Sequence, residues 1–259
     1  LYVIEANPRA SRTVPFVSKA LGIPLAKAAS RVMTGSTIDE LKAEGMLPLI
    51  DGSRVPLDSP VSVKEAVLPF KRFRTKDGQT VDSVLGPEMR STGEVMGIDR
   101  DFPTAFAKSQ EAAYGGLPLS GTVFISVADS DKRAVILPAH RLQQLGFTLV
   151  ATEGTAEILA RNGIAVTLVN KYSATQESGE RNIVDLINAG EIDIIVNTPS
   201  GRSARADGYE IRAAAVAADK ALFTTIAVLG AAVSAMDAIR DGFDVKSLQE
   251  YAIERAAKL

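Results

Sequence analysis

Residues 121–128 read GTVFISVA, a short apolar run that is rich in β-branched side chains. It follows the turn-forming stretch YGGLPLSG at residues 114–121, and an amphipathic segment reaching Gln144 comes after it. An apolar run without polar alternation is typical of a strand that is buried on both faces of a parallel sheet. The stretch therefore predicts the first strand of an α/β domain.

Four further runs of this kind follow toward the C-terminus. They read FTLVAT at 147–152, AVTLV at 165–169, DIIVN at 193–197 and LFTT at 222–225. Helix-patterned segments separate them, at 155–162, 183–189 and 208–220, and two more helices are expected after the last run. Strands that alternate with helices predict a doubly wound parallel sheet covered on both faces.

The preceding half of the chain is less regular. Residues 1–45 predict a strand, a Pro-Arg turn and helices, whereas residues 46–117 are rich in Gly, Pro, Asp and Ser and predict loops and short strands. We therefore expect two units, 1–114 and 115–259. Because Leu1 would already lie inside a strand, we also expect the chain to be the C-terminal piece of a longer protein.

Composition excludes several classes of function. A net charge of −2 argues against nucleic acid or an anionic membrane as the main partner. Without cysteine there are no disulfides, thiolate metal sites or cysteine nucleophiles, and the single His140 cannot form a histidine cluster. The most apolar run, 221–236, has 16 residues and is shorter than the roughly 20 that span a bilayer.

Polar side chains follow the predicted strands at the edge where ligands bind in such sheets. Hydroxyls, amides and helix N-terminal N–H groups around two lysines form an anion site that suits a phosphate. A phosphate site without histidine, cysteine or a clear acid–base pair is suited to binding rather than reaction. Singly, each member also has an ordinary explanation, such as a helix cap or a solvated lysine. The set comprises Ser126, Lys132, Thr152, Thr155, Lys171, Asn197, Thr198 and Gly201.

A second motif, VIEANPRASRTVPF, occupies residues 3–16. On a strand, Glu5 and Asn7 share one face, and their oxygens form a pair suited to Mg²⁺ or Mn²⁺. Arg9 and Arg12 follow at a spacing that suits phosphate oxygens. From the spacing alone, a strand end with a solvated Glu and a surface Arg pair is the favoured interpretation, and the metal and phosphate site is the alternative.

Three stretches, together with the strand pattern from about residue 115 onward, resemble the large subunit of carbamoyl-phosphate synthetase. IEANPRASRTVPFVSKALGIPLAKAA at 4–29 is similar to the end of its second ATP-grasp unit. LPFKRF at 68–73 and LGPEMRSTGEVMG at 85–97 are similar to the segment that follows. Residues 115–259 resemble its regulatory domain, which has the methylglyoxal-synthase fold.

The resemblance implies an ATP-dependent ligase that phosphorylates carbamate to carbamoyl phosphate for arginine and pyrimidine biosynthesis in the cytoplasm. In that family Glu5 and Asn7 would hold the Mg²⁺ or Mn²⁺ ions that bridge ATP phosphates, with Arg9 and Arg12 as catalytic groups beside them. The family's partner is a glutaminase small subunit. We expect this chain alone to be inactive, because the rest of the ATP site would lie before Leu1.

The resemblance also implies allosteric effectors. A nucleoside monophosphate such as UMP or IMP would occupy the predicted phosphate set, and ornithine would contact Glu94, Thr224 and Thr225. Where bacterial relatives carry a threonine after Asn-Thr, this chain has Pro199, which removes a hydroxyl and a backbone donor. Oligomers would form through the regulatory domain.

Two other functions remain open at this point. A stand-alone phosphate lyase of the methylglyoxal-synthase type needs a carboxylate base beside the phosphate, and the stretch SGERN at 178–182 offers only Glu180. A non-catalytic binding or regulatory module is the other.

Overall fold

The structure, a computed structural model, describes residues 2–3, 5–49, 58–73, 75–78, 80–86, 89–172, 181–198 and 204–256. Its larger sheet has five parallel strands in the order β5-β4-β3-β6-β7. All five predicted strands are present, and the α/β fold class is confirmed. The strands are β3 (Thr122–Ser126), β4 (Thr148–Ala151), β5 (Thr167–Leu168), β6 (Ile194–Asn197) and β7 (Ala221–Phe223).

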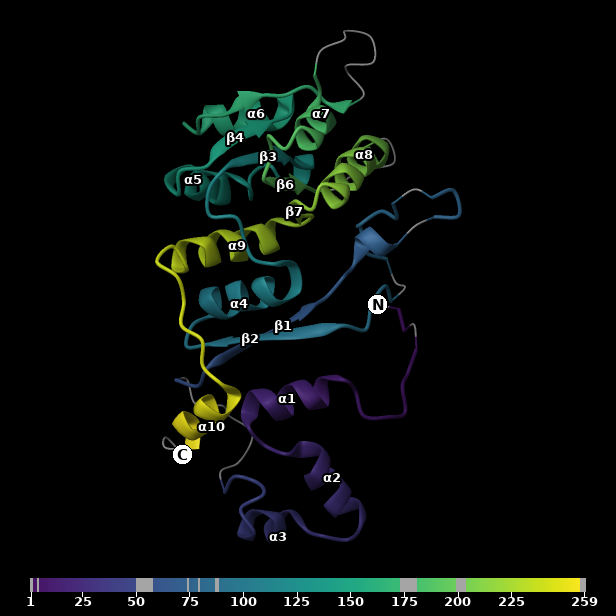
Figure 1. Cartoon of the computed structure of the whole chain (residues 1–259), viewed down its shortest axis with the longest axis vertical. Coiled ribbons are helices and arrows are strands. Elements are labelled where there is room, and N and C mark those ends of the chain that lie inside the picture. The colour runs from purple at the N-terminus through teal and green to yellow at the C-terminus, as the bar shows by residue number, and fades with distance from the viewer. Residues whose placement is uncertain are drawn as a thin grey trace.

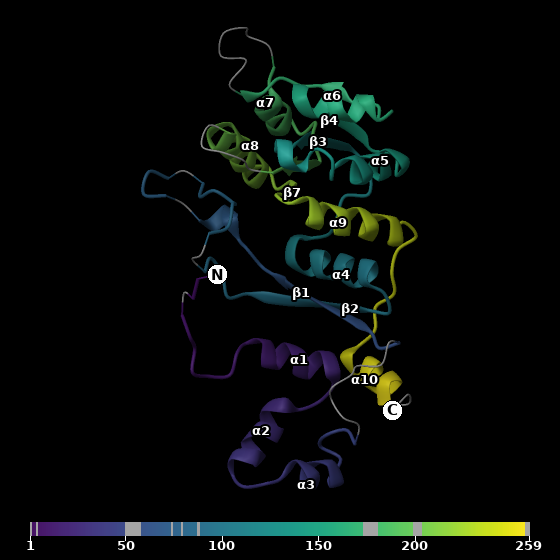
Figure 2. The same cartoon turned by 180° about the vertical axis from the view of Figure 1, so that it is seen from behind.

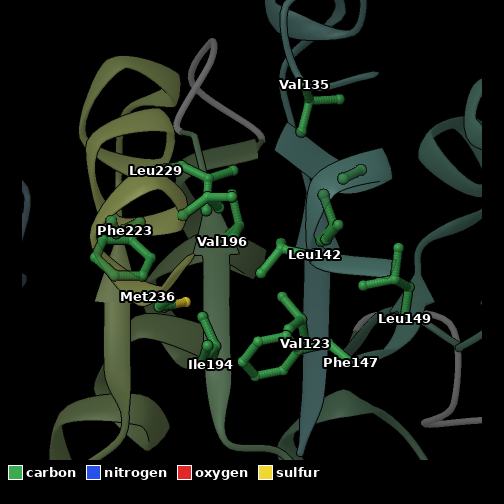
Figure 3. Packing of buried hydrophobic residues seen from close by; sticks show 14 of the residues in the cluster. Val123, Val135, Leu142, Phe147, Leu149, Ile194, Val196, Phe223, Leu229 and Met236 are labelled. Atoms are coloured by element: carbon green, nitrogen blue, oxygen red, sulfur yellow. The ribbon is translucent and has the colours of Figure 1, made fainter. Parts of the chain in front are cut away.

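Helices cover both faces of this sheet (Figure 1). Because strand side chains alternate, Val123 and Ile125 enter one core while Phe124 enters the other. The first core joins the sheet to α5 (Ile136–Gln144), α6 (Glu153–Arg161) and α9 (Ile226–Ala238), and Figure 3 shows Val123, Ile194 and Met236 within it. The second core joins the sheet to α7 (Ile183–Asn188) and α8 (Ala204–Ala217). Burial on both faces explains the continuous apolar strand sequences.

A second layer lies against α9. Strands β1 (Val61–Ala66) and β2 (Glu94–Asp99) form an antiparallel pair, and α4 (Phe102–Tyr114) lies between this pair and α9 in both views (Figures 1 and 2). A short 3₁₀ turn, η1 (Phe70–Arg72), lies between β1 and β2 in the sequence, and a second, η2 (Asp129–Asp131), lies between β3 and α5.

Helix α4 is missing from the sequence prediction, which gave only loops and short strands in this region. Asp101 caps the helix by accepting a 2.8 Å hydrogen bond from the backbone N–H of Thr104. Pro103 lies in the first turn, where backbone N–H groups have no helical partner, so a proline is tolerated there. Pro103 is therefore compatible with a helix start inside a stretch whose Gly, Pro, Asp and Ser content had predicted loops.

The N-terminal segment forms helices, but no strand. Helices α1 (Thr13–Leu21), α2 (Leu25–Met33) and α3 (Ile38–Ala43) are present as expected. Residues 2–3 and 5–8 belong to no strand in the described structure, so the predicted N-terminal strand is wrong. A strand needs a neighbour for its hydrogen-bond ladder, and no described strand pairs with these residues.

The last helix, α10 (Leu248–Ala256), returns to the N-terminal part of the chain (Figure 1). The Tyr251 hydroxyl donates a 3.0 Å hydrogen bond to the Ile98 carbonyl of β2. Arg255 Nη1 donates a 2.6 Å hydrogen bond to the Ala20 carbonyl at the end of α1. These contacts join both ends of the sequence around the β1–β2 pair.

Among the helices of the described residues, none is both long and apolar enough to cross a bilayer.

Gly97 lies where β2 closely approaches α4, and it provides a test of this layer. An ideal Cβ at Gly97 would lie 2.6 Å from the backbone nitrogen of Ser109 and still nearer to the Ala105 carbonyl oxygen. Gly97→Ala should force the strand and helix apart and lower the free energy of unfolding by at least about 1–3 kcal/mol in urea titrations.

Gly86→Ala is the matched control. Among the described residues, no atom beyond its chain neighbours lies within 4 Å of a Cβ built at Gly86, so the stability of this variant should be unchanged or slightly raised. Equal stabilities of the Gly97 variant and the unmodified chain would show that α4 does not pack against β2 as described.

Candidate functional site

A cavity of about 210 Å³ opens at the carboxyl edge of the parallel sheet. Because all five strands run in one direction, the segments that leave β3, β4 and β6 meet there. Gly201 and Pro199 lie outside the described residues. The other seven residues predicted for the phosphate site all line this cavity, and they are Ser126, Lys132, Thr152, Thr155, Lys171, Asn197 and Thr198.

Threonine hydroxyls tie the segments around the cavity to one another. The backbone N–H of Ala128 donates to Thr198 Oγ1 at 2.8 Å, and that of Val127 donates to Thr155 Oγ1 at 3.3 Å. A hydroxyl that accepts a bond keeps its own proton, so Thr155 and Thr198 can still donate to a ligand. The sequence suggested these threonines as ligand contacts, and the structure adds their part in shaping the loop after β3.

The two lysines make the cavity electropositive. Lys132 Nζ forms a 2.7 Å ion pair with Asp129, whose carboxyl pKa is lowered by the hydrogen bond from Lys132, with Lys171 contributing less. Lys132 also lies against the first turn of α6, since an ideal Cβ at Gly154 would be 3.0 Å from its Nζ. Two ammonium groups beside a helix N-terminus attract an anion.

Arg212 and Asp82 lie behind the cavity residue Asn197, and neither was predicted from the sequence. The Arg212 side chain on α8 is fully buried, and its Nη1 donates a 2.8 Å hydrogen bond to the cavity residue Asn197. Its Nε and Nη2 donate to the two carboxylate oxygens of Asp82, both at 2.7 Å. Burial raises the pKa of the Asp82 carboxyl, but hydrogen bonds from Arg212 and the Val84 N–H outweigh it and leave the pKa lowered.

One sequence signal was available for Arg212. It is the only charged residue in the run IRAAAVAA, residues 211–218, and a helix this apolar is buried on one face. A buried guanidinium requires a partner. The identity of that partner was not readable, because Asp82 precedes it by 130 residues.

The N-terminal motif brings the side chains of its two predicted metal-binding residues together. Asn7 Nδ2 donates a 3.0 Å hydrogen bond to Glu5 Oε1, so the amide and the carboxylate lie side by side and are exposed. Arg12 donates to the Thr92 carbonyl at 3.1 Å, and Arg9 donates to the neighbouring Ala10 carbonyl at 3.3 Å. The motif thus lies against the segment that precedes β2.

A complete metal site is not formed by the described residues alone. They contain no group of three or more histidine, cysteine or acidic side chains that could hold a cation. Glu5 and Asn7 supply two oxygen ligands of the kind that Mg²⁺ and Mn²⁺ prefer, and they fit such an ion as part of its ligand set.

The predicted ornithine residues come from two separate elements. Glu94 begins β2 and forms a 3.2 Å ion pair with Lys64 across the β1–β2 pair. Thr224 and Thr225 connect β7 to α9, where the Thr225 hydroxyl caps the helix by accepting a 3.4 Å hydrogen bond from the Val228 N–H. Thr225 therefore has a structural role besides any contact with a ligand.

Comparison with known proteins agrees with this arrangement. The family described as "Carbamoyl-phosphate synthase L chain, ATP binding domain" matches residues 1–41, and the "MGS-like domain" matches residues 134–224. Over all of its 259 residues, the chain is 76% identical to the carbamoyl phosphate synthase large chain of Clavibacter michiganensis subsp. michiganensis. The chain belongs to the carbamoyl phosphate synthase large-chain family.

Other large chains of this family are similar over nearly the whole sequence. Those of Kineococcus radiotolerans and Streptomyces coelicolor are 66% and 61% identical over 97% of the chain. The chain covers 24%, 24% and 23% of the Clavibacter, Kineococcus and Streptomyces proteins, so it spans about a quarter of their length. The resemblance stated from the sequence is thereby confirmed, and the stand-alone phosphate lyase is not favoured, since an ATP-binding family matches residues 1–41.

Proposed function

We propose that the chain is the C-terminal part of a carbamoyl phosphate synthase large chain, and that the whole protein uses ATP to phosphorylate carbamate. The observation that carries this proposal is the identity of 76% to such a large chain over every residue of the sequence. The ATP-binding family match at residues 1–41 supports it, because that match contains the whole Glu5–Arg12 motif. We expect the 259-residue chain alone to be inactive, because the ATP-binding family matches only residues 1–41 of it.

In this proposal the N-terminal motif serves the ATP phosphates. Glu5 and Asn7 would hold Mg²⁺ or Mn²⁺, which when bound neutralises phosphate charge. Arg9 and Arg12 bind and orient phosphate oxygens, and Arg12 exchanges its present hydrogen bond to the Thr92 carbonyl for one to phosphate. Phosphoryl transfer depends chiefly on such positioning and charge neutralisation.

The cavity at the sheet edge is proposed as the site of a nucleoside monophosphate effector such as UMP or IMP. Lys132 and Lys171 meet the phosphate, and hydroxyl and amide donors complete the contacts. Glu94, Thr224 and Thr225 are proposed for ornithine. We also propose that the chain is divided into units 1–114 and 115–259 and that the second unit forms oligomers. The whole protein is proposed to bind a glutaminase small subunit and to lie in the cytoplasm.

The effector proposal predicts that Lys171→Ala weakens binding of UMP or IMP about tenfold or more in calorimetric titrations. Charge-assisted hydrogen bonds contribute roughly 1.5–3 kcal/mol, which corresponds to at least this factor. Lys76→Ala removes an exposed lysine from another loop and should leave the affinity unchanged. Equal affinity of the Lys171 variant and the unmodified chain would contradict the assignment of this cavity.

The catalytic proposal predicts that Glu5→Gln in the whole protein slows ATP synthesis from carbamoyl phosphate and ADP. The substitution removes one charge from an oxygen-ligated cation, so the Mg²⁺ concentration for half-maximal rate should rise. Glu157→Gln, on the exposed surface of α6, is the control. A Glu5 variant with the unmodified rate and Mg²⁺ dependence would refute the metal role of Glu5.

A further inference from the structure

The fully buried guanidinium of Arg212 connects two parts of the molecule that are distant in sequence. Nε and Nη2 each donate a 2.7 Å hydrogen bond to Asp82, which is the paired geometry that an arginine forms with a carboxylate. Nη1 donates at 2.8 Å to the Asn197 Oδ1 atom at the end of β6. Asn197 lines the phosphate cavity, whereas Asp82 lies outside it.

This contact fixes the orientation of the Asn197 amide. A guanidinium only donates hydrogen bonds, so the amide oxygen has to face Arg212 and the amide nitrogen has to face away from it. Asn197 Nδ2 lies 3.5 Å from the Ser126 carbonyl, at the outer limit of a hydrogen bond. Asn197 therefore offers the cavity a weakly engaged donor, which suits the oxygens of a phosphate or a sugar.

Gly208 allows this cluster to form behind the cavity wall. A Cβ at Gly208 would collide with the Arg212 guanidinium and would lie 3.1 Å from Asn197 Oδ1. Gly208 itself lines the cavity. The arginine and the ligand site are therefore separated by little more than a backbone without a side chain.

The Asp82 segment, residues 80–84, is held against α8 at two points. Asp82 accepts hydrogen bonds from Arg212 and from the Val84 N–H, the latter at 3.1 Å. One helical turn before Arg212, the Tyr209 hydroxyl donates to the Thr80 carbonyl at 2.7 Å. This segment precedes the MGS-like match at residues 134–224 and lies in the other proposed unit.

We propose that Arg212 is a positioning residue that holds the Asn197 amide as a donor for the phosphate-bearing ligand, and that Asp82 acts through it. Ligand binding and the placement of residues 80–84 are then thermodynamically linked. Such linkage is reciprocal: an Asp82 segment that orders the amide favours the ligand, and the ligand favours the bound segment. The inference rests on the proposed effector function of the cavity.

The test is a double-mutant cycle on the 259-residue chain, with UMP, IMP and inorganic phosphate as probes in calorimetric titrations. Asp82→Asn removes the charge that holds Arg212 and should weaken nucleotide binding about fivefold or more, the lower range of measured couplings. Asp77→Asn, an exposed residue of the preceding loop, should bind as the unmodified chain does. In an Asn197→Ala background, Asp82→Asn should have no further effect on affinity.

Urea unfolding of every variant establishes that it folds before binding is compared. If Asp82→Asn does not fold, Asp82→Glu replaces it in the cycle, because this change keeps the charge and moves the carboxylate by one methylene. Unchanged affinity of the folded Asp82 variant would overturn the linkage. So would an equal loss of affinity with and without the Asn197 amide, since Asp82 would then act only through general stability.

Failure of the linkage is distinguishable from failure of the effector proposal. Nucleotide binding that is lost in Lys171→Ala and intact in Asp82→Asn overturns the linkage alone. Binding that survives Lys171→Ala, or an unmodified chain that binds none of the three probes, overturns the cavity assignment and the linkage together.

Discussion

The common direction of the five strands is the constraint on which the rest of the site depends. Parallel strands bring their carboxyl ends to one edge, so Ser126, Thr152 and Asn197 become neighbours although up to 71 residues separate them. Two apolar cores hold the sheet between its helices, and each fully buried large side chain contributes about 1.5–3 kcal/mol. Because these cores stabilise the sheet, the polar side chains at its edge can bind an anion.

The buried charge of Arg212 is the exception to this division. Removing one partner of a buried ion pair typically costs about 3–5 kcal/mol, and somewhat less here because the Asp82 side chain is 33% exposed. The same pair crosses the proposed boundary between units 1–114 and 115–259. Helix α4 also packs against α9, and α10 contacts Ile98 and Ala20. These contacts and the Arg212–Asp82 pair join the two proposed units.

The sequence predicted most of the parallel sheet, because strands buried on both faces have continuous apolar runs. It also predicted that Lys171 and Thr155 lie at the carboxyl edge of the sheet, since each closely follows a strand that was predicted to be parallel to its neighbours. Asp82 could not be assigned this way, because no local pattern tells which loop reaches a buried arginine 130 residues later. The expected strand before Arg9 was wrong, because alternation alone does not supply a neighbouring strand. Helix α4 was missed because the Gly, Pro, Asp and Ser content of residues 46–117 is typical of loops.

The central claim is that ligand binding in the phosphate cavity and the placement of the Asp82 segment are thermodynamically linked. Hydrogen exchange of residues 80–84 tests this claim most directly. The Val84 amide donates to the Asp82 carboxylate and reports on its placement. With UMP or IMP at saturation, exchange of this segment should slow relative to the free chain, while exchange of the exposed turn at residues 75–78 should not change. Saturated binding without any added protection of residues 80–84 would contradict the account.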